Sequence, residues 1–179
     1  MGRRTVASAA ALALLFGAAG MAGAKGAGAA DVAAEATAAM TNSDGNSVGT
    51  VALEQGAQGT LLHARLTNLP PGTLAIHVHE TGTCEAPDFT SAGGHYNPTD
   101  QAHGLLAEDG YHAGDLPNIH VPESGTLEVE HFSERLKLDD DLFDEDGAAI
   151  VIHVDADDYR TNPAGDAGAR IACGVVERN

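Results

Sequence analysis

The amino-acid sequence predicts an all-β fold. Several short segments alternate apolar and polar residues, as strands with one buried face do. Turn residues separate them, most clearly at positions 44–45, 123–125 and 146–147, and no internal repeat interrupts the pattern. Short strands at this spacing are typical of a β-sandwich or a β-barrel.

The first element has two interpretations. Residues 31–40 are rich in alanine, and their intrinsic propensity favours a helix. The same residues could equally form a first strand that pairs with residues 48–53 through the turn at 44–45, because an all-β context overrides propensity. The sequence leaves both alternatives open.

Six later segments are expected to be strands. Residues 127–132 alternate hydrophobic residues with glutamates, which predicts one buried and one solvent-facing side. Residues 149–154 form a short apolar run around His153, as a buried strand would. The other expected strands are residues 48–53, 61–66, 74–79 and 171–176.

Two long stretches, residues 79–115 and 155–170, show no strand pattern. The first is rich in Gly, Pro, Asp and His. Stretches of this length inside a compact domain usually carry function. Trp is absent and aromatic residues are scarce, so the core must be built from Val, Ile, Leu and Ala.

The N-terminal residues have the pattern of an export signal. Arg3 and Arg4 precede an apolar run over residues 6–24, and small-residue cleavage patterns follow at 22–24 and 27–29. A transmembrane anchor is the alternative, but the run is rich in Ala and Gly and no basic stop-transfer cluster follows it.

We therefore expect a signal peptide over residues 1–29, cleaved near residue 24 or 29, and one mature domain over residues 30–179. The mature protein is expected in a bacterial periplasm, with an extracellular location as the alternative. The whole chain carries a net charge of −17. So acidic a protein is not expected to bind nucleic acid or, once the signal is removed, a membrane.

Both cysteines of the chain, Cys84 and Cys173, lie in the expected mature domain. In an oxidising compartment two cysteines most simply form a disulfide. Two free or metal-bound thiols are the alternative.

Six of the nine histidines lie in or at the edge of the two long stretches, at His77, His79, His95, His103, His112 and His153. His77 and His79 are two residues apart on an expected strand, so both side chains share one face and could chelate one copper or zinc ion. The alternative is an exposed pair of strand histidines.

His103, His112 and Asp115 form a second candidate group. Imidazoles with one carboxylate are a common zinc set, and the Gly-containing loop allows them to fold around one ion. A solvated acidic loop is the alternative. His63, His120 and His131 lie on expected strands or their ends and are interpreted as surface or structural histidines.

Five segments, taken in order, resemble the copper–zinc superoxide dismutases: HVHETGTC, SAGGHYNP, AHGLLAEDGYHAGDLPN, IHVDADD and GDAGARIACGVV. The resemblance as a whole covers the chain from about residue 33 to residue 176. The resemblance implies an eight-stranded Greek-key β-barrel with its site on the two long loops. It also implies an antioxidant enzyme that dismutates superoxide to oxygen and hydrogen peroxide.

The same resemblance implies one copper and one zinc ion per chain. Copper would be held by four histidines, at His77, His79, His95 and His153. Zinc would be held by His95, His103, His112 and Asp115. His95 would thus bridge the two metals and, with Arg170, form the catalytic pair.

Further residues match supporting positions of the family. Asp157 matches the carboxylate that ties a copper ligand to a zinc ligand, and Cys84 and Cys173 match its disulfide. Arg170 matches the arginine that docks the anionic substrate; a mere salt bridge to Asp166 is the alternative.

The sequence departs from the family pattern in two places. Residues 157–170 are fewer than in animal cytosolic relatives and contain no lysine, which leaves the steering of superoxide open. Gly94 stands where many relatives have proline. A homodimer is one option for the assembly. A copper-buffering domain without turnover and an adhesion-type β-sandwich are the competing functions.

Overall fold

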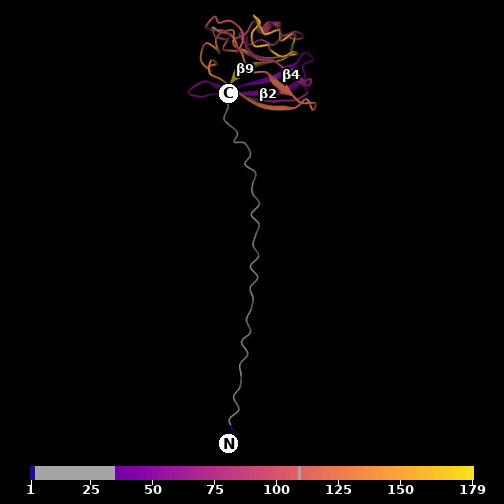
Figure 1. Ribbon diagram of the computed structural model, residues 1–179, viewed down its shortest axis with the longest axis vertical. Coiled ribbons are helices and arrows are strands. Elements are labelled where there is room, and N and C mark those ends of the chain that lie inside the picture. The colour runs from indigo at the N-terminus through magenta and orange to yellow at the C-terminus, as the bar shows by residue number, and fades with distance from the viewer. Residues whose placement is uncertain (3–34, 109) are drawn as a thin grey trace. The chain divides into compact units, whose positions relative to one another are not determined.

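The computed structural model describes residues 1–2, 35–108 and 110–179 (Figure 1). The expected signal-peptide run and both expected cleavage sites lie outside these residues. Within the described ranges, no helix has the length and hydrophobicity needed to cross a membrane.

The fold is all-β, as the sequence predicts. The described residues form nine strands and one short 3-10 helix, η1 (Thr90–Ala92). The strands are β1 (Ala36–Asn42), β2 (Ser47–Gln55), β3 (Thr60–Leu66), β4 (Gly72–Leu74), β5 (Ile76–His79), β6 (Ile119–Val121), β7 (Leu127–Ser133), β8 (Ala149–His153) and β9 (Arg170–Arg178).

Seven of these strands form one antiparallel sheet in the order β5-β8-β9-β1-β2-β3-β7, and β4 pairs with β6. The structure divides the expected strand 74–79 in two, which gives nine strands where the resemblance implies eight. At the division, Ala75 donates to the carbonyl of Asp155 at 2.8 Å and accepts from the amide of His153 at 2.9 Å. The chain therefore changes strand partners at Ala75.

The alanine-rich first element is a strand from Ala36 onward, so the helix alternative is wrong for β1. Its residues pair with β2 on one side and β9 on the other. The turn to β2 is closed by Asn42, whose Oδ1 accepts the amides of Asp44 and Asn46 at 3.1 and 2.9 Å. Two neighbouring strands outweigh the modest helix preference of alanine.

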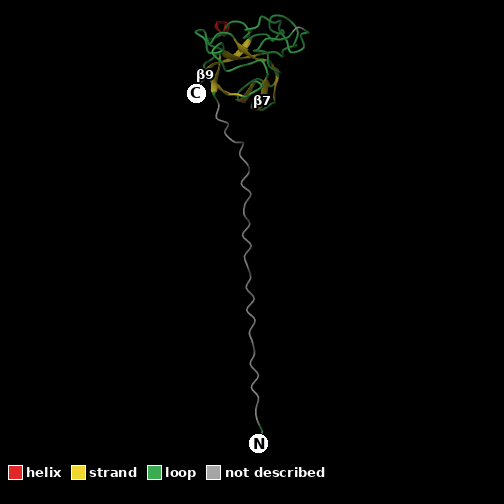
Figure 2. Cartoon of the chain, turned by 90° about the vertical axis from the view of Figure 1, so that its left-hand side faces the viewer, coloured by secondary structure: helices red, strands yellow, loops and turns green. Residues whose placement is uncertain are grey.

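The main core lies on one face of the curved sheet. It is built from Val, Leu, Ile and Ala, as expected, with Met40 and Tyr96 as larger members. Strand β8 is buried on both faces, because Ile150 and Ile152 join this core while Ala149 and Val151 face a second, smaller cluster. Figure 2 shows the loops gathered on one side of the strands.

The free edge of β5 holds the long loop that follows it. Val78 donates to the carbonyl of Gly114 at 2.9 Å and accepts from the amide of Tyr96 at 2.8 Å. A Cβ on Gly114 would overlap the carbonyl oxygen of Val78, so only glycine permits this approach. The pairing sets His95 opposite His79 and Asp115 opposite His77.

Candidate metal centre

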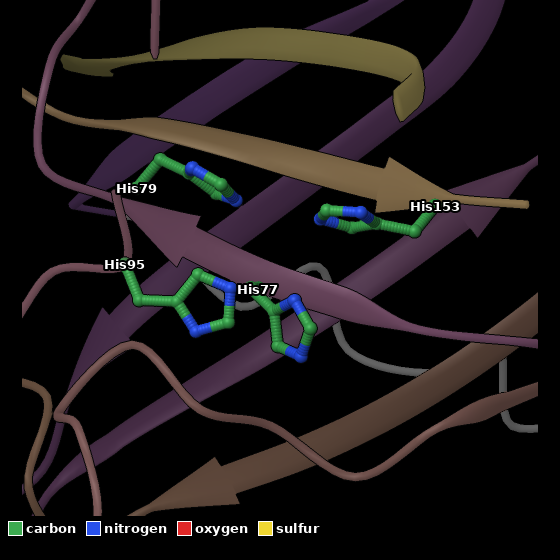
Figure 3. Close-up of side chains that lie close together, drawn as sticks. All are labelled: His77, His79, His95 and His153. Atoms are coloured by element: carbon green, nitrogen blue, oxygen red, sulfur yellow. The ribbon is translucent and has the colours of Figure 1, made fainter. Parts of the chain in front are cut away.

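Four buried imidazoles converge at the ends of β5 and β8. His77 and His79 come from β5, His153 ends β8, and His95 comes from the loop paired to β5. Figure 3 shows the four rings facing a common space. One nitrogen from each ring lies within 4.8 Å of the others, so the group could hold one metal ion.

The unpartnered nitrogens identify the donor atoms of this group. Five buried side-chain nitrogen or oxygen atoms of the described residues have no hydrogen-bond partner, and four of them belong here. They are Nδ1 of His77 and Nε2 of His79, His95 and His153. Buried polar atoms are normally satisfied, and four imidazole lone pairs suit a copper ion.

The opposite nitrogen of three of these rings is anchored. His77 Nε2 donates to Asp157 Oδ2 at 2.8 Å and His79 Nδ1 donates to the carbonyl of Gly93 at 3.0 Å. His153 Nδ1 donates to the carbonyl of Gly168 at 3.2 Å. Such bonds fix the tautomer and the ring orientation, so each lone pair is directed inward.

A second group surrounds Asp115. The Nδ1 atoms of His95, His103 and His112 lie 2.8, 3.0 and 3.2 Å from its Oδ1. Its other oxygen accepts the amides of Gly104 and His112 at 2.8 and 3.1 Å, which fixes the carboxylate. Three imidazoles and one carboxylate within reach of one ion are a donor set that zinc accepts.

One ring belongs to both groups. Nδ1 of His95 faces Asp115, while its Nε2 is among the unpartnered atoms of the first group. The centroids of the His77 and His95 rings are 4.0 Å apart, so the two groups adjoin directly. The arrangement therefore permits one imidazole to contact two metal ions.

Asp157 links the groups a second time. Its Oδ2 accepts from His77 and its Oδ1 accepts from His103 Nε2 at 3.0 Å. Asn118 holds the backbone of Asp157 through two bonds of 2.9 Å. Asn118 could not be identified from the sequence, because a single asparagine has no distinctive spacing.

The electrostatics favour neutral imidazoles at three histidines of the first group. Burial and neighbouring histidines lower the pKa of His153 to about 3, and burial likewise lowers the pKa of His95 to about 4. Burial, His95 and Arg170 hold the pKa of His79 well below its usual value. A neutral imidazole is the form that binds metal.

In the second group, the pKa of a histidine is raised rather than lowered. Burial lowers the pKa of His103, but hydrogen bonds to Asp115 and Asp157 outweigh it and raise that pKa to about 9. Burial raises the pKa values of the Asp115 and Asp157 carboxyls, but the hydrogen bonds from histidines outweigh burial and lower both pKa values. This anionic pair attracts positive charge, and a metal ion bound there would displace the proton of His103.

Arg170 lies half-buried beside the first group. Its guanidinium donates to the carbonyls of Phe89 and Gly93 at 2.7 and 2.6 Å. The Gly93 carbonyl also accepts from His79, so one backbone oxygen positions both side chains. Among the described residues, Arg170 forms no ion pair with Asp166.

The disulfide between Cys84 and Cys173 is confirmed. It joins the loop after β5 to the middle of β9. The three histidines interpreted as structural lie outside both metal groups. His63 contacts Glu128 at 2.8 Å and His120 contacts Thr73 at 3.1 Å, while Nε2 of His131 is buried without a partner.

An Asp157→Asn variant should bind metal about 10- to 100-fold more weakly, because an amide cannot accept from both His77 and His103 as a carboxylate does. Competition with a chelator measures the affinity of each site. Asp158→Asn is the matched control, since Asp158 is exposed, accepts from the amides of Arg160 and Thr161 and from the hydroxyl of Thr161, and contacts no histidine of either group. Equal affinities for the two variants would contradict this role of Asp157.

Comparisons with known proteins agree with this geometry. A family model described as copper/zinc superoxide dismutase matches residues 47–176. A copper–zinc superoxide dismutase of Aquifex aeolicus is 46% identical over 143 residues, covering 77% of this chain and 85% of that protein. The copper–zinc superoxide dismutase of Caulobacter vibrioides is 42% identical over 148 residues, covering 79% and 85%.

Solved structures show the same likeness. A mutant of a superoxide dismutase-like protein from Bacillus subtilis has a TM-score of 0.75 at 41% identity, covering 78% of this chain and 95% of that chain. The Cu/Zn superoxide dismutase from Brucella abortus has a TM-score of 0.68 at 32% identity, covering 80% and 100%.

Proposed function

The chain belongs to the copper/zinc superoxide dismutase family, and we propose that it converts superoxide to oxygen and hydrogen peroxide. The observation that carries this function is the set of four inward-facing, unpartnered nitrogens, one of them on a ring shared with the Asp115 group. The family match and the similar relatives confirm the resemblance that the sequence segments indicate.

Each metal group has a defined set of proposed ligands. His77, His79, His95 and His153 would hold one copper ion, and the Asp115 group would hold one zinc ion. When bound, copper supplies one-electron oxidation and reduction, whereas zinc has no redox chemistry and supplies a fixed charge. Asp157 would hold a ring of each set in its binding orientation.

Arg170 is the proposed docking residue for the substrate anion. A guanidinium has five N–H donors, and the described contacts use donors toward Phe89 and Gly93 only. The remaining donors are available to a small anion beside the copper ligands. In a protein of net charge −17, such a local cation provides the attraction that the overall charge opposes.

His95 is the proposed proton carrier. Its Nε2 is buried and faces the same space as the copper ligands, whereas its Nδ1 is engaged by Asp115. Nε2 is therefore the ring atom placed to hold a proton and to give it to the product as hydrogen peroxide forms. Nδ1 of the ring faces Asp115 and would be held there by the zinc group.

The protein is proposed to act outside the cytoplasm. The signal peptide over residues 1–29 and the mature domain over residues 30–179 are part of this proposal. The disulfide supports it, because structural disulfides persist in oxidising compartments such as the periplasm. Homodimer formation stays a prediction that sedimentation of the mature protein would decide.

Metal analysis combined with an activity assay tests the function. The purified mature protein should contain one copper and one zinc per chain and should dismutate superoxide. Removal of copper should abolish the activity, and its return should restore it. A fully metal-loaded protein without activity would mean that the chain only stores or buffers copper.

A further inference from the structure

The cleft in front of Arg170 contains a second charged side chain that the proposed reaction does not use. This cleft of about 350 Å³ is lined by residues 87, 88, 90 and 168–170. Its two charged residues, Arg170 and Asp88, are of opposite sign. An anion approaching the guanidinium would therefore also approach a carboxylate.

Asp88 is held in place by the turn that carries it. Its Oδ1 accepts the amide of Thr90 at 3.1 Å and the hydroxyl of Thr90 at 2.9 Å. The intervening Phe89 is 1% exposed and packs in the small cluster with Val151 and Cys173. The carboxylate is thus a fixed group on a buried anchor.

The same turn holds the guanidinium. The carbonyl of Phe89 accepts from Nη1 of Arg170 at 2.7 Å, directly after Asp88 in the chain. Among the described residues, Asp88 and Arg170 form no ion pair, so the carboxylate does not occupy the donors of Arg170. Asp88 acts on the cleft through its field alone.

The exposed carboxylate is ionised at neutral pH, as aspartates ordinarily are, and the hydrogen bonds from Thr90 lower its pKa further. Burial lowers the pKa of Arg170, and the nearby charge of Asp88 opposes that shift. This interaction stabilises the guanidinium cation. The same field lowers the positive potential that an incoming anion meets.

We propose that Asp88 controls the strength of anion capture at this cleft, because its fixed carboxylate weakens the capture of small monoanions by Arg170. For superoxide as the anion, the inference rests on the proposed function. Asp88 limits the rate of capture and equally limits occupation of the site by inhibitory anions of the same charge.

An Asp88→Asn variant tests the inference, because the amide oxygen can still accept from Thr90 while the charge is lost. In the metal-loaded mature protein at low ionic strength, kcat/KM for superoxide should rise about two- to fourfold. Azide, followed by the visible absorption of copper, should bind more tightly by a similar factor. Both differences should shrink as salt is added.

Glu35→Gln is the matched control, since it removes one exposed negative charge far from the cleft. Glu35 adjoins β1 at the end where Ala36 pairs with Arg178, which is roughly 26 Å along β9 from Arg170. At 0.01 M salt the Debye length is about 30 Å, so the charge of Glu35 still reaches the cleft, but more weakly than that of Asp88, which lines it. At 0.1 M salt the Debye length is about 10 Å, and the charge of Glu35 is largely screened from the cleft.

The outcomes are distinguishable. Equal rates and azide affinities in the two variants would overturn the role of Asp88, as would an Asp88→Asn effect that persists unchanged at high salt. The azide titration needs no turnover. A wild-type protein that binds azide at copper but does not dismutate superoxide would therefore refute the enzyme function, and its azide affinity would still show whether Asp88 weakens anion capture.

Discussion

A His95→Ala variant is expected to lose more than about 100-fold in dismutation rate and to bind its two metals independently. Loss of a partner that merely orients a ligand typically costs 10- to 100-fold, and His95 is proposed to be a ligand of both metals. The variant also loses Nε2, the proposed proton carrier. Steady-state activity per bound copper measures the first effect.

The coupling between the metals needs a second measurement. Removing zinc should change the copper absorption spectrum of the wild-type protein and leave that of the variant unchanged. His120→Ala is the control, because His120 is exposed, contacts Thr73 and lies outside both groups. A wild-type copper spectrum that does not respond to zinc removal would argue against a shared His95.

Loss of the disulfide is expected to have the largest effect on stability. The bond joins residues 89 positions apart, and a cross-link over so long a loop restricts the unfolded chain strongly. Replacing Cys84 and Cys173 with serine should lower the free energy of unfolding by about 2–5 kcal/mol. For a domain of this size, the melting temperature should fall by roughly 10 °C.

Thermal unfolding of the metal-free protein, with and without a thiol reductant, measures this effect. The reduced wild type keeps its side chains and loses only the cross-link, so it should resemble the double variant. The double variant should not respond to reductant. If the oxidised and reduced wild-type proteins melted at the same temperature, the disulfide would have no stabilising role.

Reduction should also lower the activity per bound copper. Both cysteines belong to the cluster around Phe89, whose carbonyl positions Arg170. Loosening this cluster would release the guanidinium from its position beside the copper ligands.

Much of the sheet could be predicted because several of its strands have one buried face. The alternation in β2, β3 and β7 follows directly from that burial. β6 was not predicted, since three residues are too few to show a period of two. The division between β4 and β5 depends on which strands lie beside Ala75, and local sequence does not specify those partners.

The site could be predicted only in part. Residue type and spacing marked His77 and His79 as a candidate pair, and the family resemblance supplied the other candidate ligands. The ligand assignments themselves stay predictions. The carbonyls of Phe89 and Gly93 could not be predicted, because every residue has a carbonyl and only the folded loop brings these two to Arg170.

The backbone pairing along β5 also bears on self-association. β5 has one neighbour in the sheet, β8, and its other edge is occupied by the loop that carries His95. If the loop detached, the amide and carbonyl of Val78 would be exposed on an edge strand, a template for pairing with another chain. Metals that hold His95 and Asp115 in place would thereby also protect the protein against aggregation.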